Sequence, residues 1–154
     1  MKRSQALGNA LIAALVVFGA DRWLKNVIVE SMELGQSMPL LGPLRLTYVH
    51  NTGAAFSLLA GNPLLLAGFS LLVLVGIIVY MFKLGGNEPK ITLTLAILAG
   101  GAAGNLYDRV MHSYVVDYLD IGFWPVFNLA DVAIVLSCAA LVFQVWYKER
   151  ASSG

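Results

Sequence analysis

The chain has 154 residues, of which 58% are hydrophobic and only 12% are charged, and its net charge is +1. This composition is far more apolar than that of an average soluble domain, and it leaves no polar helix faces to solvate a soluble helical protein. No run of basic residues indicates a nucleic-acid partner. We therefore expect one integral membrane domain that covers residues 1–154.

Four uncharged runs account for most of the apolar residues: Ser4 to Ala20, Leu64 to Phe82, Ile91 to Tyr107 and Val132 to Tyr147. With its polar ends, each run is close to the roughly 20 residues that an α-helix needs to cross about 30 Å of hydrocarbon. The sequence thus predicts an all-α membrane protein, a bundle of four transmembrane helices at about residues 7–29, 63–82, 90–111 and 127–147.

Basic residues fall on one side of the membrane if the four helices alternate in direction: Lys2, Arg3, Lys83, Lys90, Lys148 and Arg150. By the positive-inside rule this side is the cytoplasm. Both termini are then cytoplasmic, and the loops at about residues 26–62 and 111–125 lie on the outer face.

The first helix carries Asp21 and Lys25 near its outer end. Four residues apart, the two side chains share a helix face and can form an ion pair. A charge in the middle of a transmembrane helix costs roughly 2.5–3.5 kcal/mol on insertion scales, so such residues are expected to be functional or paired. The alternative is an ion pair that only orients the helix end, with Trp23 as an interfacial anchor.

The first outer loop has the pattern of a folded segment. Residues 44–50 alternate between apolar and polar and are rich in β-formers, which predicts a small extracytoplasmic β element, a cradle on the membrane surface. A short surface helix is expected in the same loop, and residues 53–59 are expected to form a cradle or lid, with Gly53 permitting a tight backbone. Asn51 can offer donors and an acceptor to a peptide backbone, or it can be an ordinary turn asparagine.

The third helix changes character along its length. Gly100 and Gly104 have the small-xxx-small spacing that lets helices approach closely. Beyond them Asn105 and Arg109 share a helix face, and Asp108 sits beside them. We expect close backbone contact below a polar helix end, an arrangement that can hold a site rigidly.

Two aspartates near the start of the last helix suggest chemistry. Asp117 is placed in the second outer loop, and Asp131 follows Asn128 at the spacing of a capping box. An aspartate in the first turn also suits the helix dipole, so capping alone could explain Asp131. Two carboxylates that share one site can instead act as general base and general acid on a water and a carbonyl.

These features, taken in order, resemble the lipoprotein signal peptidases, also called type II signal peptidases. The matching stretches are Asp21 with Lys25, residues 51–57 (NTGAAFS), Gly104-Asn105 through Asp108-Arg109, residues 115–117 (VVD) and residues 127–131 (FNLAD). One departure is Ser113, where the family often has glycine before the Val-Val-Asp run.

The resemblance implies an aspartic endopeptidase of the bacterial cytoplasmic (inner) membrane with its active site at the extracytoplasmic face. The substrates would be diacylglyceryl-modified prolipoproteins, cleaved just before the lipidated cysteine. The other expected partners are membrane lipid and the inhibitor globomycin; the protein would act as a monomer, without cofactor or metal. The implied site residues are the catalytic dyad Asp117 and Asp131, the lining residues Asn51, Gly53, Asn105, Arg109 and Asn128, and the supporting pair Asp21 and Lys25.

Three other functions were considered. A small proton-coupled transporter could use Asp21 as a membrane carboxylate, although the acidic residues cluster at one face. A metallohydrolase could draw on His50, His112, Asp117, Asp120 or Asp131, but no histidine pair has helical ligand spacing. A pure scaffold would leave the polar residues of the third and fourth helices unexplained.

Overall fold

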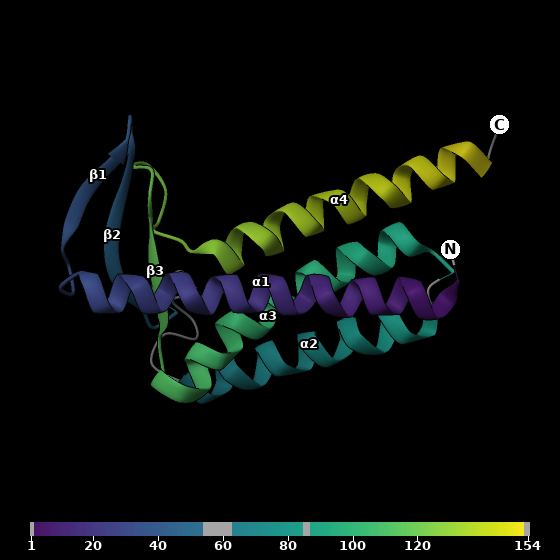
Figure 1. The fold of residues 1–154 in the computed structure, drawn as a ribbon, viewed down its shortest axis with the longest axis horizontal. Coiled ribbons are helices and arrows are strands. Elements are labelled where there is room, and N and C mark those ends of the chain that lie inside the picture. Colours follow the sequence, from purple (N-terminus) through teal and green to yellow (C-terminus); the bar gives the residue numbers. More distant parts are fainter. Residues whose placement is uncertain (1, 54–62, 85–86, 153–154) are drawn as a thin grey trace.

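The computed structural model describes residues 2–53, 63–84 and 87–152 of the chain. The described residues form four long helices and a small sheet (Figure 1). The elements are α1 (Arg3–Ser31), β1 (Ser37–Leu41), β2 (Leu44–Asn51), α2 (Pro63–Leu84), α3 (Pro89–His112), β3 (Val115–Asp120) and α4 (Leu129–Ser152).

The predicted helices all form, within a few residues of their expected ends. Within the described part of the chain, three helices have the length and apolarity of a membrane span, and they are α1, α2 and α4. Helix α3, which contains several glycines and a polar outer end, is not among them. A membrane-spanning role for α3 therefore stays a prediction, while the mostly helical membrane fold is confirmed.

The chain termini lie at one end of the molecule and the sheet lies at the other (Figure 1). Helix α3 occupies the centre, because it packs against α1, α2 and α4. This arrangement matches the alternating helix directions expected from the sequence. It also gathers the polar ends of α1, α3 and α4 next to the sheet.

Glycines on α3 allow the central helix to approach two neighbours at once. A Cβ atom at Gly100 would lie 2.6 Å from a backbone oxygen of α1, and one at Gly101 would lie 2.7 Å from a backbone oxygen of α4. A Cβ atom at Gly104 would collide with the carboxylate of Asp21. The close approach expected for Gly100 and Gly104 is therefore present, against α1.

The sheet has the antiparallel order β1-β2-β3 and packs its apolar face on the outer end of α1. Its core consists of Ile28, Met32, Tyr48, Val116 and Tyr118. The sequence predicted β2 but not its neighbours. The placement of Asp117 in a loop was wrong, since this residue lies in β3 opposite Val49. Residues 115–118 are all buried, so this strand lacks the alternation that marks a half-buried one.

Gly53 ends the described part of the first outer loop. Its φ angle of +90° is readily adopted by glycine, and a Cβ there would collide with the side chain of Leu66. The tight backbone expected at this position is thus present. The lid was expected at residues 53–59, and all of these except Gly53 lie outside the described residues. The surface helix was expected in the same loop, and the described part of this loop after α1 contains no helix.

Replacing Gly100 by alanine should destabilise the bundle, because the new methyl group meets a backbone oxygen of α1 that cannot rotate away. Overpacking of this kind costs about 1–3 kcal/mol. Gly76→Ala on α2 is the matched control, since a Cβ there has no neighbour within 4 Å. Thermal unfolding in detergent should show a lower midpoint for Gly100→Ala alone; equal midpoints for the two variants would contradict the close packing.

Candidate active site

The start of α4 is held by groups from other elements. The Leu129 N–H donates to the Tyr118 hydroxyl at 3.3 Å, and the Ala130 N–H donates to Asp21 Oδ1 at 3.1 Å. The first N–H groups of a helix have no partner within the helix, so these bonds satisfy them. They also tie the first turn of α4 to β3 and to α1.

Asn128 and Asp131 close a reciprocal capping box at this helix start. The Asp131 N–H donates to Asn128 Oδ1 at 2.9 Å, and the Asn128 N–H donates to Asp131 Oδ2 at 3.3 Å. The expected cap is confirmed. The second carboxylate oxygen of Asp131 accepts a bond from Asn105 Nδ2 at 2.8 Å, so capping and a role in a site do not exclude each other.

Asp117 is buried in β3 between two amide donors. Its Oδ2 accepts from Asn51 Nδ2 at 2.8 Å, and its Oδ1 accepts from Asn128 Nδ2 at 2.6 Å. Burial, reinforced by the nearby charge of Asp131, raises the pKa of Asp117 to about 6, while the two amide bonds oppose the rise. The carboxyl group is therefore poised to take up or release a proton near neutral pH.

Two asparagines connect the two carboxyl groups. Asn128 Nδ2, which donates to Asp117, also lies 3.1 Å from Asn105 Oδ1, and Asn105 in turn donates to Asp131. Each amide can donate and accept at once, so an unbroken hydrogen-bonded chain links the carboxylates. We call these four residues the Asp-Asn array. The structure brings together, at the sheet end of the bundle, the two aspartates singled out in the sequence.

Beneath the array lies a buried cluster of ions centred on Lys25. Its Nζ is 2.8 Å from Asp21 Oδ2, 2.8 Å from Asp108 Oδ2 and 2.9 Å from Asn105 Oδ1. Lys25, Asp21 and Asp108 have no exposed side-chain surface. The Asp21–Lys25 pair expected from the sequence is confirmed, and it is part of a larger cluster that includes the array through Asn105.

Sequence reasoning missed two members of this cluster. Asp108 was noted without a partner, yet its carboxylate binds Lys25 and Arg22 and accepts from the Val116 N–H at 3.3 Å. Arg22 was not considered at all, although its guanidinium also lies over the Tyr107 ring. The i, i+4 rule finds partners only within one helix, whereas these contacts join α1 to α3 and β3.

Asn51 and Gly53 form one side of the site. Asn51 Oδ1 accepts the Gly53 N–H at 2.8 Å, while its amide group donates to Asp117. Asn51 is therefore a turn asparagine and a partner of the site at the same time. The turn reading offered by the sequence is confirmed, while a contact between Asn51 and a peptide backbone stays a prediction.

Arg109 points donors into a groove between α2, α3 and α4. Among the described residues its hydrogen bonds are two long contacts of 3.4 Å, to Ser70 Oγ and to the Asn105 carbonyl. A guanidinium has five N–H donors, so most of those of Arg109 have no partner among the described residues. The groove has a volume of about 350 Å³, and its wall includes Arg109, Asn105, Asp131 and Cys138. We call it the interhelical groove.

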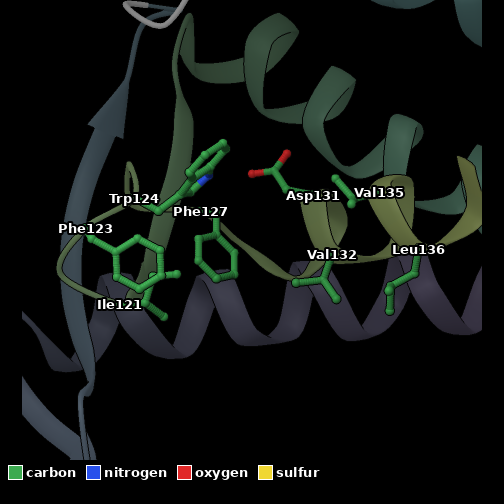
Figure 2. Close-up of a pocket in the computed structure, with 8 residues that line it drawn as sticks. All are labelled: Ile121, Phe123, Trp124, Phe127, Asp131, Val132, Val135 and Leu136. Carbon is green, nitrogen blue, oxygen red and sulfur yellow. The ribbon is translucent and has the colours of Figure 1, made fainter. Parts of the chain in front are cut away.

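A second groove lies on the other side of Asp131 (Figure 2). Its volume is also about 350 Å³. We call it the α4 groove, and its lining is Ile121, Phe123, Trp124, Phe127, Asp131, Val132, Val135 and Leu136. In Figure 2 the Asp131 carboxylate points toward Trp124. Asp131 therefore lines both grooves.

The histidines proposed for a metal site contact tyrosine side chains. His50 stacks on the Tyr114 ring at 3.6 Å between centroids and shares a hydrogen bond of 2.8 Å with the Tyr48 hydroxyl. The part of the chain described here contains no cluster of three or more His, Cys, Asp or Glu side chains able to hold a metal ion. The metallohydrolase alternative thus finds no ligand set among these residues.

The fold is shared with solved bacterial membrane enzymes. A bacterial membrane enzyme determined at 1.9 Å by the in meso method superposes with a TM-score of 0.82 and 26% identity, covering 90% of this chain and 92% of that one. A second, determined at 2.3 Å, gives a TM-score of 0.78 and 24% identity over 96% of this chain and 92% of that one. Together with the apolar helices, this likeness defines an integral membrane protein with the fold of these bacterial membrane enzymes.

Sequence comparison identifies the family. The sequence model of signal peptidase (SPase) II matches residues 13–147, and the chain belongs to this family. The lipoprotein signal peptidase of Halothermothrix orenii is 39% identical over 90% of this chain and 96% of its own length. That of Moorella thermoacetica is 43% identical over 88% of this chain and 91% of its own. The family is one of membrane proteases that process lipoproteins.

Replacing Lys25 by methionine should strongly destabilise the protein, because the carboxylates of Asp21 and Asp108 would stay buried without their shared cation. Removing one partner of a buried ion pair costs about 3–5 kcal/mol. Lys148→Met is the control, since its pair with Glu88 is exposed and such pairs contribute little. Thermal unfolding midpoints should fall for Lys25→Met and barely change for Lys148→Met.

A double variant tests the cause of that loss. Asp21→Asn combined with Lys25→Met removes one of the stranded charges, so it should recover part of the lost stability. A double variant less stable than Lys25→Met alone would show that Lys25 acts through packing and not through charge.

Proposed function

We propose that this protein is an aspartic endopeptidase that removes the signal peptide from diacylglyceryl-modified prolipoproteins, by cleaving before the lipidated cysteine. The observation that carries the proposal is the Asp-Asn array, in which Asp117 and Asp131 belong to one hydrogen-bonded chain. Two carboxyl groups that share a site hold one proton between them, which suits acid–base catalysis of peptide hydrolysis. Family membership supports the substrate class.

In the proposed mechanism Asp117 holds the shared proton, since burial raises its pKa to about 6. Asp131 lies in the first turn of α4, where the helix dipole favours a negative charge, and it acts as the general base. It takes a proton from water as the water oxygen attacks the scissile carbonyl, and Asp117 protonates the carbonyl oxygen. Asp131 then donates its proton to the leaving nitrogen as the C–N bond breaks, and Asp117 takes back a proton from a hydroxyl of the tetrahedral intermediate, which becomes the product carboxyl group.

The other site residues divide into two groups. Asn105 and Asn128 commit their amides to the two carboxyl groups, so we assign them to orienting the dyad. Arg109 lines the interhelical groove beside Asp131, has donors without a partner among the described residues, and is assigned to the substrate backbone. Asn51 with Gly53 forms the opposite side of the site. Asp21 and Lys25 support the array from below.

The site suits a substrate that arrives from the outer leaflet. We propose that residues 1–154 form one domain of the bacterial inner membrane, with α3 as the fourth span and both termini in the cytoplasm. The dyad then lies at the extracytoplasmic face, at the depth of a lipid-modified cysteine. We also propose that the enzyme is a monomer in contact with membrane lipid, and that globomycin occupies the dyad site.

The structure gives no support to the transporter alternative, which needed Asp21 as a proton carrier. The Asp21 carboxylate is bound by Lys25 at 2.8 Å and by the Ala130 N–H at 3.1 Å. Both contacts give it a structural role at the junction of α1 and α4. The peptidase proposal accounts for the same residues and for the array above them.

Replacing either dyad residue by asparagine should abolish cleavage of a diacylglyceryl-modified prolipoprotein, because the shape is kept while the proton capacity is lost. Loss of a general acid or base costs about 10²–10⁴-fold in rate. Asp120→Asn is the matched control: Asp120 lies in the same strand as Asp117 but bonds outward to Thr47 at 2.8 Å. Purified Asp117→Asn or Asp131→Asn that cleaves at the rate of the Asp120→Asn control would refute the dyad.

The pH profile tests the assignment of the proton to Asp117. If Asp117 must be protonated, kcat/KM should fall as the pH rises through an apparent pKa near 6. The Asn51 amide bond favours the ionised form, so Asn51→Ala should raise the pKa of Asp117 and move this fall to higher pH. Thr47→Val, which removes a bond to Asp120 instead, should leave the profile in place.

Two results would contradict this assignment. A rise of kcat/KM through the same pH range would make Asp117 the base. A shift of the Asn51→Ala profile to lower pH would show that the amide favours the protonated form.

A further inference from the structure

The α4 groove is the part of the active-site region to which the proposed mechanism gives no role. It extends from the connection between β3 and α4 along the outer surface of the first turns of α4 (Figure 2). At its rim Phe123 is 85% exposed and Trp124 is 64% exposed. Apart from Asp131 its lining consists of apolar residues. Large exposed aromatics beside a groove indicate a surface that binds an apolar partner.

The two grooves that meet at Asp131 differ in their hydrogen-bonding groups. The interhelical groove contains Arg109, Asn105 and Ser70, which can satisfy the N–H and C=O groups of a peptide. The side chains that line the α4 groove offer only the Asp131 carboxylate and the single indole N–H of Trp124. A peptide backbone placed there would leave buried polar groups without partners, whereas an alkyl chain has none to satisfy. The α4 groove therefore fits an acyl chain better than a peptide.

The α4 groove is also open along the surface that the membrane would cover. Val135 and Leu136 on α4 are each 64% exposed, and α4 has the length and apolarity of a membrane span. An acyl chain in the bilayer could therefore enter the α4 groove beside Val135 and Leu136 without crossing water. Trp124 at the outer rim suits the headgroup level, where tryptophan is enriched.

We infer that the α4 groove receives the acyl chains of the substrate's diacylglyceryl group, while the signal peptide lies in the interhelical groove. This inference rests on the proposed function. The scissile bond joins the lipidated cysteine to the signal peptide, and Asp131 lies where the two grooves meet. Occupying both grooves at once places this bond beside Asp131. The α4 groove thus selects for lipidated substrate.

Narrowing the α4 groove with a bulky side chain tests this assignment, because the effect should depend on the length of the substrate's acyl chains. Val135→Trp narrows the α4 groove. Val142→Trp is the control, because Val142 lies on the same helix, is 71% exposed and is not part of the groove lining. Two substrates carry the same peptide, one with two long acyl chains and one with two short ones. Val135→Trp should raise the KM of the long-chain substrate on the order of tenfold, with little change in kcat, since the lost contacts are made before the chemical step.

The short-chain substrate should show nearly the same KM in Val135→Trp as in wild type and Val142→Trp. Each substrate partitions into detergent in the same way for all three proteins. This effect therefore cancels when the KM of a variant is divided by the KM of the wild type for the same substrate. A KM that changes equally for both substrates, or for neither, would overturn the groove assignment while leaving the peptidase function standing.

A second measurement does not depend on turnover or on the folding of Val135→Trp. A photoreactive diazirine at the end of one acyl chain should label residues of the α4 groove in Asp131→Asn, which holds the substrate uncleaved. Labelling on the side of α4 that bears Ile134 and Cys138, or on α2, would overturn the assignment. Failure of the wild type to cleave the long-chain substrate would instead overturn the proposed function.

Discussion

The buried ammonium group of Lys25 is the contact on which the rest of the outer end depends. It binds Asp21, which accepts a bond from the first turn of α4, and Asp108, which accepts a bond from the backbone of β3. It also binds the oxygen of Asn105, whose amide then points its hydrogens at Asp131. One cation thus orients three acceptors, and through them it positions the start of α4, the strand that carries Asp117 and the amide between the carboxylates.

The use of amides between the carboxylates has a physical reason. A lysine or arginine placed between Asp117 and Asp131 would favour the ionised form of both, and the shared proton would be lost. The amides of Asn105 and Asn128 hold the carboxyl groups in place without a full charge. The cation Lys25 contacts the oxygen of Asn105, while amide groups contact the carboxylates of Asp117 and Asp131. In the proposed mechanism this arrangement keeps the supporting cation apart from the two carboxyl groups that exchange protons.

Patterns of a few neighbouring residues predicted those parts of the structure that depend on interactions within one helix. The Asp21–Lys25 pair and the capping box at Asn128 follow from helix geometry within a few residues, and the structure contains both. The four helices follow from apolar runs of sufficient length. The family resemblance added the pairing of Asp117 with Asp131, which their separation of fourteen positions in the sequence could not establish.

Contacts between distant segments decided what the sequence did not reveal. Strand β3 exists because β2 and the backbone at Phe127 bond to it, and its buried side chains show no alternation. Asp108 found its partners on α1, more than eighty positions away. Ser113 ends α3 with a φ angle of +67°, a left-handed conformation that glycine adopts more easily, so the backbone here would also suit the glycine that the family resemblance implies.

The two aspartates differ because they sit on different secondary structures. Asp117 lies in a strand, and burial favours its protonated form. Asp131 lies at the N-terminus of α4, where the helix dipole favours a negative charge, and its Oδ2 is held by the helix cap while Oδ1 faces Asn105. In the proposed mechanism, a strand and a helix start joined by one short connection thus give two identical side chains opposite tasks. The same connection carries Trp124 and Phe123, so the segment that brings the dyad together also builds the groove beside it.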